Sequence, residues 1–492
     1  MVAGKRKTHC SIKKYIMLFP MLVLIFYTNI MLLGCVAVGP DYVQPAISSP
    51  DVWHNRLKNG LVNNETDYRM LTRWWGGLKD PVLLSLINRA VTGNLDVKIA
   101  QARVREARAR RGLSKTDMFP TLDASGSLTK SRSNEQESDL YSMAFDAVWE
   151  LDIFGKVRRS VEAADADLQA SGEDLRNVLV SLTAEVALNY VEFRTYQAQL
   201  STTKENFELQ QETYKLTQWR CEAGLDDELP VQQARYNMES TRAQIPALRT
   251  SVEESKNRIA VLLGKQPGML HDELKSSATI PVVSPKIAVG IPADMLRRRP
   301  DVRKAERELA AQTARIGVAT ADLYPQLRLA GSIGLKSEEF SDVIKSASQF
   351  WSIGPGISWN IFNAGAVRRN IEIQSALQEQ SLRSYEASVL NALEEVENEL
   401  VAYAEEQNRR GSLYEAVQAA ECAVELSRDK YQAGLIDFGD LLDAERSRLS
   451  YQNQLIQSDG SVASNLVRLY KVLGGGWNTS ADEQGSEWRK QR

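Results

Sequence analysis

The sequence predicts an α+β membrane protein in which four transmembrane β-strands per chain join those of other copies in a shared barrel, with long α-helical hairpins attached to the strands. Three observations predict this fold. The chain of 492 residues contains an internal two-fold repeat. Each half has two runs in which apolar and polar residues alternate. Each half also has a stretch without proline that is too long for a globular domain.

Residues 1–34 are predicted to be an export signal. Five basic residues lie within the first 14 positions, and no charged residue occurs between Tyr15 and Pro40. The segment Leu32-Leu33-Gly34-Cys35 resembles a lipobox, which predicts cleavage before Cys35 and a lipid on that cysteine. Val36 follows instead of aspartate, which favours sorting to the outer membrane. A permanent transmembrane helix is the alternative, because the uncharged run exceeds ~20 residues.

The composition excludes several classes of function. The formal net charge of −3 becomes −8 without the signal, so the mature chain has no broad attraction for nucleic acid. Four cysteines and three scattered histidines predict neither a disulfide framework nor a metal site. Because no nucleophile elbow or phosphate loop occurs, we expect no enzyme activity and no cofactor.

The repeat defines the organisation of the chain. Residues 95–120 align with 300–325, the motif from Trp149 to Arg159 aligns with Trp359 to Arg369, and Ala223-Gly224-Leu225 aligns with Ala433-Gly434-Leu435. Each half is predicted to run helix, strand, strand, long helix, turn, long helix. The predicted segments are a signal peptide (1–34), a lipidated N-terminal segment (35–73), a first repeat (74–264), a linker (265–290), a second repeat (291–474) and a C-terminal tail (475–492).

The four strands are predicted at about 119–131, 140–153, 324–336 and 350–363. From Tyr141 to Leu151 the odd positions are apolar, and the even positions include Ser142, Asp146 and Glu150. The polar segments 130–139 and 336–349 are predicted to be loops. Two soluble hairpins with one buried face would give the same alternation. In a membrane, four strands cannot close a barrel, so several chains must contribute, and three chains would supply about twelve strands.

The helices predicted after the strands are long. Lys156–Ala223 and Ala366–Ala433 lack proline, and about 68 residues of helix span roughly 100 Å. Return helices are predicted at Leu229–Leu263 and Phe438–Leu473. Helices of this length need other helices as neighbours, packed as in a coiled coil.

Several motifs resemble the outer membrane factor (TolC-like) family, in its lipoprotein branch associated with RND-type efflux systems. They are Val38-Gly39-Pro40-Asp41-Tyr42, residues 291–302, Gly354-Pro355-Gly356-Ile357-Ser358-Trp359 and Tyr431-Gln432-Ala433-Gly434. The resemblance implies a homotrimer in the outer membrane, with a 12-stranded barrel and a periplasmic α-barrel. It also implies a passive duct that exports drugs or other small molecules, docked to a periplasmic membrane-fusion adaptor and an inner-membrane pump.

The resemblance also implies a periplasmic gate at Tyr431, Asp440 and Asp443, where two aspartates per chain would give about six carboxylates around a three-fold axis. The alternative is that Asp440 only stabilises the start of a helix. Ile436 and Pro230 stand where TolC has a basic gate residue and an acidic partner, so an interchain salt lock of the TolC type is not expected.

Two other functions stay open from the residues alone. One is a periplasmic coiled-coil scaffold or adaptor lipoprotein without a pore, and the other is a duct specific for metal ions. The arginines at 297–299 are interpreted as part of a helix start with Pro300. Cys221 and Cys422 are predicted to be free thiols, because parallel register places them ~13 Å apart along the helices.

Overall fold

The structure is a computed structural model that describes residues 37–46, 50–55, 57–62, 71–133, 136–281, 287–289 and 292–477. The predicted signal peptide and Cys35 lie outside the described residues. The chain forms two compact units, and each draws on both halves of the repeat. Unit 1 comprises Met1–Pro45, Arg105–Ala170 and Glu306–Ser384, and unit 2 comprises Ala46–Val104, Ser171–Ala305 and Tyr385–Arg492.

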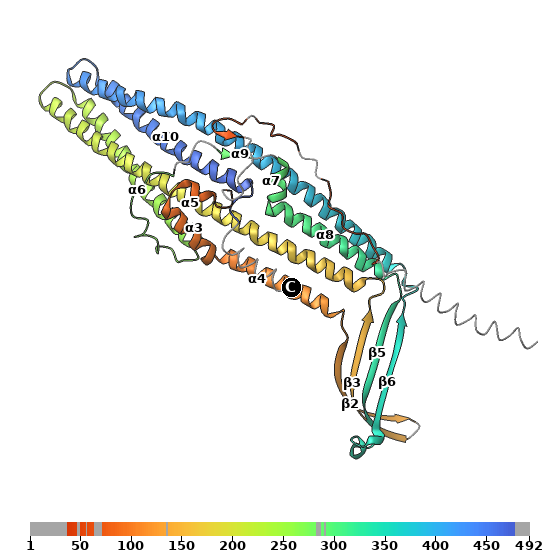
Figure 1. Ribbon diagram of the computed structural model, residues 1–492. Helices are drawn as coiled ribbons and strands as arrows, with labels where there is room; N and C mark the ends of the chain where they lie inside the picture. The colour runs from red at the N-terminus through yellow and green to blue at the C-terminus, as the bar shows by residue number, and fades with distance from the viewer. Residues whose placement is uncertain are drawn as a thin grey trace, which may run out of the picture. The chain divides into compact units, whose positions relative to one another are not determined.

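The order of elements confirms the predicted internal repeat (Figure 1). The first half contains α4 (Leu95–Thr116), β2 (Thr121–Ser133), β3 (Gln136–Leu151), α5 (Lys156–Glu222) and α6 (Glu228–Leu262). The second contains α8 (Pro300–Ala321), β5 (Gln326–Ser337), β6 (Gln349–Ser358), α9 (Ala366–Gln432) and α10 (Phe438–Val472). Outside this repeated set lie β1 (Leu61–Val62), η1 (Trp74–Leu78), α3 (Pro81–Gly93), β4 (Ile287–Ala288), α7 (Pro292–Arg298), η2 (Phe340–Asp342) and η3 (Ser346–Ser348).

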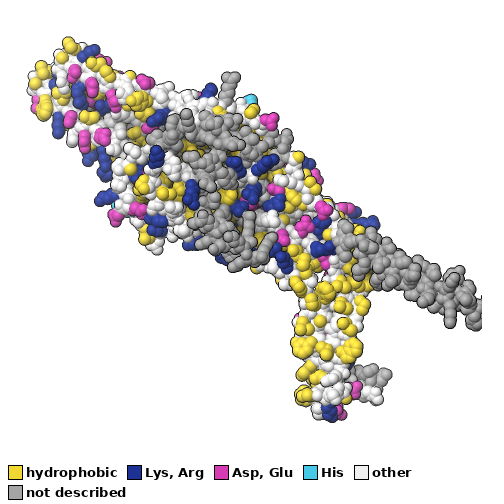
Figure 2. Space-filling model, viewed as in Figure 1, with side chains coloured by type: hydrophobic (Ala, Val, Ile, Leu, Met, Phe, Trp, Pro, Cys, Tyr) yellow, Lys and Arg dark blue, Asp and Glu magenta, His cyan; other side chains and the backbone are white. Residues whose placement is uncertain are grey.

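The four long strands of unit 1 form one antiparallel sheet in the order β2-β3-β5-β6. Phe145 lies opposite Ala124 on one side and Ile333 on the other, and Ile333 lies opposite Trp351. This row belongs to an apolar face whose large side chains are exposed (Figure 2). The neighbouring row, Asp123, Asp146, Ser332 and Ser352, belongs to the other face, because side chains alternate along a strand. The predicted alternation is therefore confirmed.

The prediction of a loop at 130–139 is wrong for the described residues 130–133 and 136–139, which belong to β2 and β3. Lys130 pairs with Asp139 and Arg132 with Glu137 in the β2–β3 ladder, and each pair has its charged groups 3.8 Å apart. Both strands are polar here, so the periodicity of apolar residues gives no signal, although cross-strand pairs of opposite charge stabilise the ladder. The fourth strand also ends earlier than predicted, at Ser358, and the indole of the next residue, Trp359, donates to the Leu323 carbonyl at 3.0 Å.

The main core of unit 2 lies where η1 and α3 pack against α5 and α6. Leu83, Leu86 and Ile87 of α3 are 0% exposed and contact this cluster. Asp80 caps α3, because its carboxylate accepts the amides of Val82 and Leu83 at 2.9 and 3.0 Å. Truncating any one of these buried aliphatic side chains to alanine would cost about 2–5 kcal/mol.

No helix among the described residues is both long enough and apolar enough to cross a membrane.

Candidate functional site

The candidate site lies in unit 2, where the turn between α5 and α6 meets the turn between α9 and α10 (Figure 1). The repeat makes these two turns equivalent, but their side chains differ. The first turn supplies Arg220 and Asp226, whereas the second supplies Tyr431 and Phe438. We call Arg220, Asp226 and Tyr431 the turn lock, because they join the two hairpins.

Tyr431 is buried within the chain, with only 2% of its surface exposed. Its hydroxyl donates to Asp226 Oδ2 at 2.7 Å, and the Arg220 guanidinium lies 4.7 Å from the ring centroid. Phe438 packs edge-on against the ring, with 5.5 Å between centroids. Ala234, Leu441 and Leu442 belong to the same small apolar cluster. Tyr431 therefore points into the contact between hairpins of one chain.

Arg220 and Asp226 form a two-pronged ion pair beneath this ring. Nε and Nη2 of Arg220 donate to the two carboxylate oxygens at 2.7 and 3.3 Å, and Nη1 donates to the Gln432 carbonyl at 3.3 Å. The hydrogen bond from Arg220, followed by that from Tyr431, holds the pKa of Asp226 below its usual 3.8. Burial, and then the hydrogen bond to Asp226, raise the pKa of Tyr431, so the phenol stays protonated as the donor.

The three predicted gate residues differ in burial within one chain. Tyr431 belongs to the turn lock, whereas Asp440 and Asp443 near the start of α10 are exposed. Asp437 occupies the N-cap position, but its side chain makes no capping hydrogen bond. The stabilisation expected for an acid in the first helical turn falls to Asp440.

Sequence reasoning missed Arg220 and Asp226. Pro230, which stands where TolC has an acidic partner, lies in the first turn of α6, whereas the acid that binds Tyr431 is Asp226. A signal was available, because Asp226 aligns in the repeat with Ile436, and an arginine precedes it by six residues across a turn. The pairing with Tyr431 spans 205 positions of sequence and needs the tertiary fold.

A seam of polar residues continues from the turn lock along α5. The buried residues of α5 between 201 and 222 are all polar and recur at intervals of three and four: Thr203, Asn206, Gln210, Thr213 and Thr217. Asn206 donates to Gln452 at 2.9 Å, and Thr213 donates to Glu445 at 2.8 Å. The two hairpins therefore meet through hydrogen bonds where a coiled coil ordinarily has apolar side chains.

Glu445 is the most buried acid of this contact, at 1% exposed. Burial raises its pKa, and the Thr213 hydrogen bond and the charges of Arg428 and Arg448 act in the opposite direction. An acid whose folded-state pKa is raised destabilises the fold once pH rises through that pKa. Glu445 in its charged form therefore weakens the contact between hairpins at neutral pH.

Of the three arginines at 297–299, Arg299 has a structural role. Arg299 is buried, pairs with Asp301 and Glu395 at 2.6 Å each, and donates to the Val472 carbonyl at the end of α10 at 3.0 Å. Cys221 and Cys422 are free thiols. Among the described residues, no group of three or more His, Cys, Asp or Glu side chains could hold a metal ion.

We expect Tyr431→Phe to loosen the two turns, because it removes a hydrogen bond to a charged group worth about 1.5–3 kcal/mol. Spin labels at the exposed positions 225 and 435, in a chain lacking Cys221 and Cys422, would report the distance between turns. The distance distribution should broaden in Tyr431→Phe and more so in Asp226→Asn. It should also broaden in the parent as pH falls below 3.8 and through the lowered pKa of Asp226, because protonation of that carboxylate removes the charge that Arg220 and Tyr431 bind. Tyr414→Phe, at an exposed position of α9, is the control; equal broadening there would refute the lock.

We expect Glu445→Gln to stabilise the folded chain at pH 7–8, because it removes a buried charge and keeps an acceptor for Thr213. The gain should shrink as pH falls and vanish below about 4.5, where the parent carboxyl is protonated in both states. Thermal unfolding from pH 4 to pH 8 measures this difference. Glu415→Gln, at an exposed position of α9, should show no such dependence. A loss of stability at pH 8 in Glu445→Gln would mean that the charge contributes favourably.

Comparison with known proteins identifies the family. Residues 86–265 and 291–475 match the family described as outer membrane efflux protein. The chain is 32% identical over 461 residues to nodulation protein T of Rhizobium leguminosarum bv. trifolii, which covers 92% of this chain and 97% of that protein. It is 30% identical over 461 residues to the cation efflux system protein CusC of Escherichia coli, which covers 93% and 99%.

The fold is also similar to solved structures. The structure of the outer-membrane channel OprN superposes with a TM-score of 0.84 and 36% sequence identity, covering 90% of this chain and 100% of that chain. This likeness and the family match confirm the TolC-like resemblance drawn from the sequence motifs. The chain therefore belongs to the outer membrane efflux protein family and is an outer-membrane efflux channel with a TolC-like fold.

Proposed function

We propose that this protein works as a homotrimeric passive duct in a tripartite efflux system, with a periplasmic membrane-fusion adaptor and an inner-membrane pump that drives export. The observation that carries the proposal is the sheet of unit 1. Its apolar face is exposed, and its edge strands β2 and β6 each lack a partner on one side among the described residues. An unpaired strand edge is not stable in the hydrocarbon of a bilayer.

The direction of the strands favours closure by identical copies. β2 and β6 run antiparallel to each other, because each neighbouring pair in the order β2-β3-β5-β6 is antiparallel. The β6 edge of one copy can therefore continue the antiparallel ladder with β2 of the next. Two copies would give a barrel of about eight strands, whose interior would be filled by side chains. Three copies would give about twelve strands and leave a lumen.

The polar face of the sheet supports a water-filled lumen. Asp123, Asp146 and Ser332 form one row, and Glu150 and Arg328 are neighbours in the next row but one, 3.7 Å apart at their charged groups. If the apolar face contacts lipid, this face lines the barrel. Charged and hydroxyl side chains there suit the passage of solutes in water.

We propose that Tyr431, Asp440 and Asp443 form the periplasmic gate, and that Tyr431 acts there as a member of the turn lock. Asp440 and Asp443 are exposed in one chain, so three copies could bring about six carboxylates together. Tyr431 would act indirectly, because its hydrogen bond to Asp226 connects α9 to the first hairpin. Opening would then require that the turn lock release the second hairpin.

Docking to the adaptor is proposed at the turns, where Leu225 and Leu435 are 66% and 73% exposed. We also propose that a lipid on Cys35 anchors the chain in the outer membrane after the signal peptide, residues 1–34, is removed. The relatives differ in what their names indicate, since CusC is described as a cation efflux system protein and another relative as a nodulation protein. We therefore propose export of small molecules as a class and leave selection of the cargo to the pump.

Cysteine crosslinking tests the trimer. Cysteines replacing Ser125 on β2 and Ser352 on β6 belong to the same face of the sheet but to opposite edges. A disulfide needs Cα atoms within ~7 Å. Because the register between β6 of one copy and β2 of the next is not known in advance, cysteines at positions 123 and 127 should be tested as well. Oxidation should give covalent dimers and trimers and nothing larger, and single-cysteine variants should give neither. A ladder that stops at two copies, or continues beyond three, would contradict the proposal.

Conductance tests the gate. Divalent cations added on the periplasmic side should block the purified channel in planar bilayers, because they bridge clustered carboxylates. Asp440→Asn combined with Asp443→Asn should relieve the block at least tenfold in cation concentration and leave the trimer intact. Glu425→Gln with Asp429→Asn removes the same charge from exposed positions of α9 and should keep the block. An unchanged block in the first variant would place the constriction elsewhere.

A further inference from the structure

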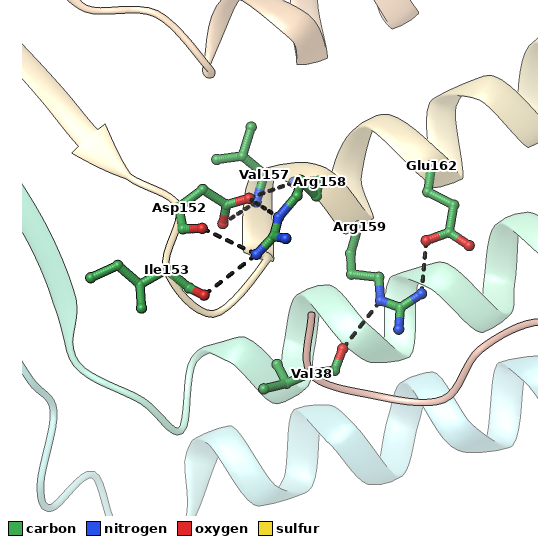
Figure 3. A network of polar contacts seen from close by, with 7 residues as sticks. All are labelled: Val38, Asp152, Ile153, Val157, Arg158, Arg159 and Glu162. Atoms are coloured by element: carbon green, nitrogen blue, oxygen red, sulfur yellow. Dashed lines mark hydrogen bonds and ion pairs between the residues drawn. The ribbon is translucent and has the colours of Figure 1, made fainter. Parts of the chain in front are cut away.

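In unit 1, the residues that follow the predicted lipidation site are fixed against the start of α5 (Figure 3). The Val38 amide donates to the Phe154 carbonyl at 3.1 Å. Arg159, 4% exposed, donates through Nε to the Val38 carbonyl at 3.2 Å and through Nη2 to the Gly39 carbonyl at 3.4 Å. The same Nη2 pairs with Asp41 at 2.6 Å. A single guanidinium thus binds two backbone carbonyls and one carboxylate of residues 38–41.

Close backbone approach reinforces these hydrogen bonds. A Cβ atom added to Gly39 would lie 2.4 Å from the Gly317 Cα of α8, and one added to Gly317 would lie 2.9 Å from the Val38 carbonyl oxygen. At Gly155 an added Cβ would lie 2.5 Å from the Ala37 side chain. No side chain fits at these positions without displacing the segment. We call Gly155, Arg159 and Gly317 the N-terminal clamp.

The repeat supplies an internal comparison. Gly365, Arg369 and Gly112 are equivalent to the three clamp residues. An added Cβ at Gly365 or Gly112 meets no described atom within 4 Å, and Arg369 is exposed, with its side chain paired to Glu372 at 2.6 Å. The repeated fold therefore forms without such a clamp. The clamp is specific to the copy that receives the N-terminal segment.

The clamp lies at the helix end of the sheet. Phe154, which accepts the Val38 amide, stacks on Tyr324 with 4.7 Å between ring centroids. Trp149, near the end of β3, donates to the Met118 carbonyl at 3.0 Å. Aromatic rings at strand ends mark the level of a membrane interface. Cys35 precedes Val38 by three residues, and three residues of chain reach at most about 11 Å.

We propose that the N-terminal clamp positions the lipid-bearing end of the chain at this end of the sheet, so that the acyl chains enter the leaflet that surrounds this end of the strands and anchor the chain together with them. A diacylglycerol-type lipid is the chemical group concerned, and the proposal rests on the proposed lipidation of Cys35. Single acyl chains hold proteins only reversibly in a bilayer. A fixed, short connection keeps the lipid next to the barrel strands while they insert.

The test uses Gly317→Ala, because alanine suits the interior of a helix while its Cβ would collide with the clamped segment. Gly112→Ala, the equivalent change in α4, is the matched control. In the lipidated protein, Gly317→Ala should leave palmitate labelling unchanged, abolish hydrogen-exchange protection of the Val38 amide, and lower the amount of assembled trimer in the outer membrane several-fold. Arg159→Ala should behave alike, and Gly112→Ala and Arg369→Ala should match the parent.

A second background distinguishes positioning of the lipid from a general effect on folding. The same variants are made in a Cys35→Ser chain exported by a cleavable signal that adds no lipid. Without the lipid, Gly317→Ala should cause no further loss of trimer. An equal loss in both backgrounds, or no loss in the lipidated chain, would overturn the proposal for the clamp alone. Absence of palmitate from the parent protein would instead overturn the lipidation of Cys35, and the clamp proposal with it.

Discussion

The strand edge is the constraint on which the rest of this protein depends. Backbone amides and carbonyls at an unpaired edge have no water to bind in a bilayer, so the four-stranded sheet of unit 1 is incomplete as a single chain. Because the sheet has an even number of antiparallel strands, its two edge strands run in opposite directions. Identical copies can therefore pair edge to edge and continue the antiparallel sheet. Once copies must surround an axis, the alternation of apolar and polar residues assigns one face to lipid and the other to the interior.

In unit 2 the two hairpins are held together differently from most long helices. Within the cluster around Tyr431, apolar side chains pack closely, but the seam from Thr203 to Thr217 meets α10 through amide, hydroxyl and carboxylate groups. Polar groups of this kind lose less when water replaces their partners than apolar groups do. Glu445 and the turn lock make the contact dependent on protonation as well as on packing. The hairpins are thus joined firmly at a few points and weakly between them.

The sequence predicted the repeated order of elements because its signals are local. Proline, glycine and the alternation of apolar residues placed the predicted start of α5 at Lys156 and its predicted end within one residue of Glu222. The extension of β2 and β3 past Lys130 was missed, since it depends on pairing between polar residues. Tyr431 was identified only through a family resemblance, and its acidic partner Asp226 was not identified. The motif at residues 38–42 and the repeated Arg159 were both recognised, but their pairing was not, because it spans about 120 positions of sequence and needs the tertiary fold.

The polar seam of α5 has a thermodynamic consequence for any separation of the hairpins. The heat capacity change of such a step is set by the apolar surface that water gains, at about 0.45 cal/K/mol per Å², and exposed polar surface subtracts from it. Separating residues such as Asn206 and Thr213 from Gln452 and Glu445 exposes mainly polar atoms. The enthalpy of separation therefore changes little with temperature along the seam. The equilibrium for such a separation would therefore follow a nearly constant enthalpy over temperature, whereas an apolar coiled-coil seam of the same length would give a strongly curved dependence.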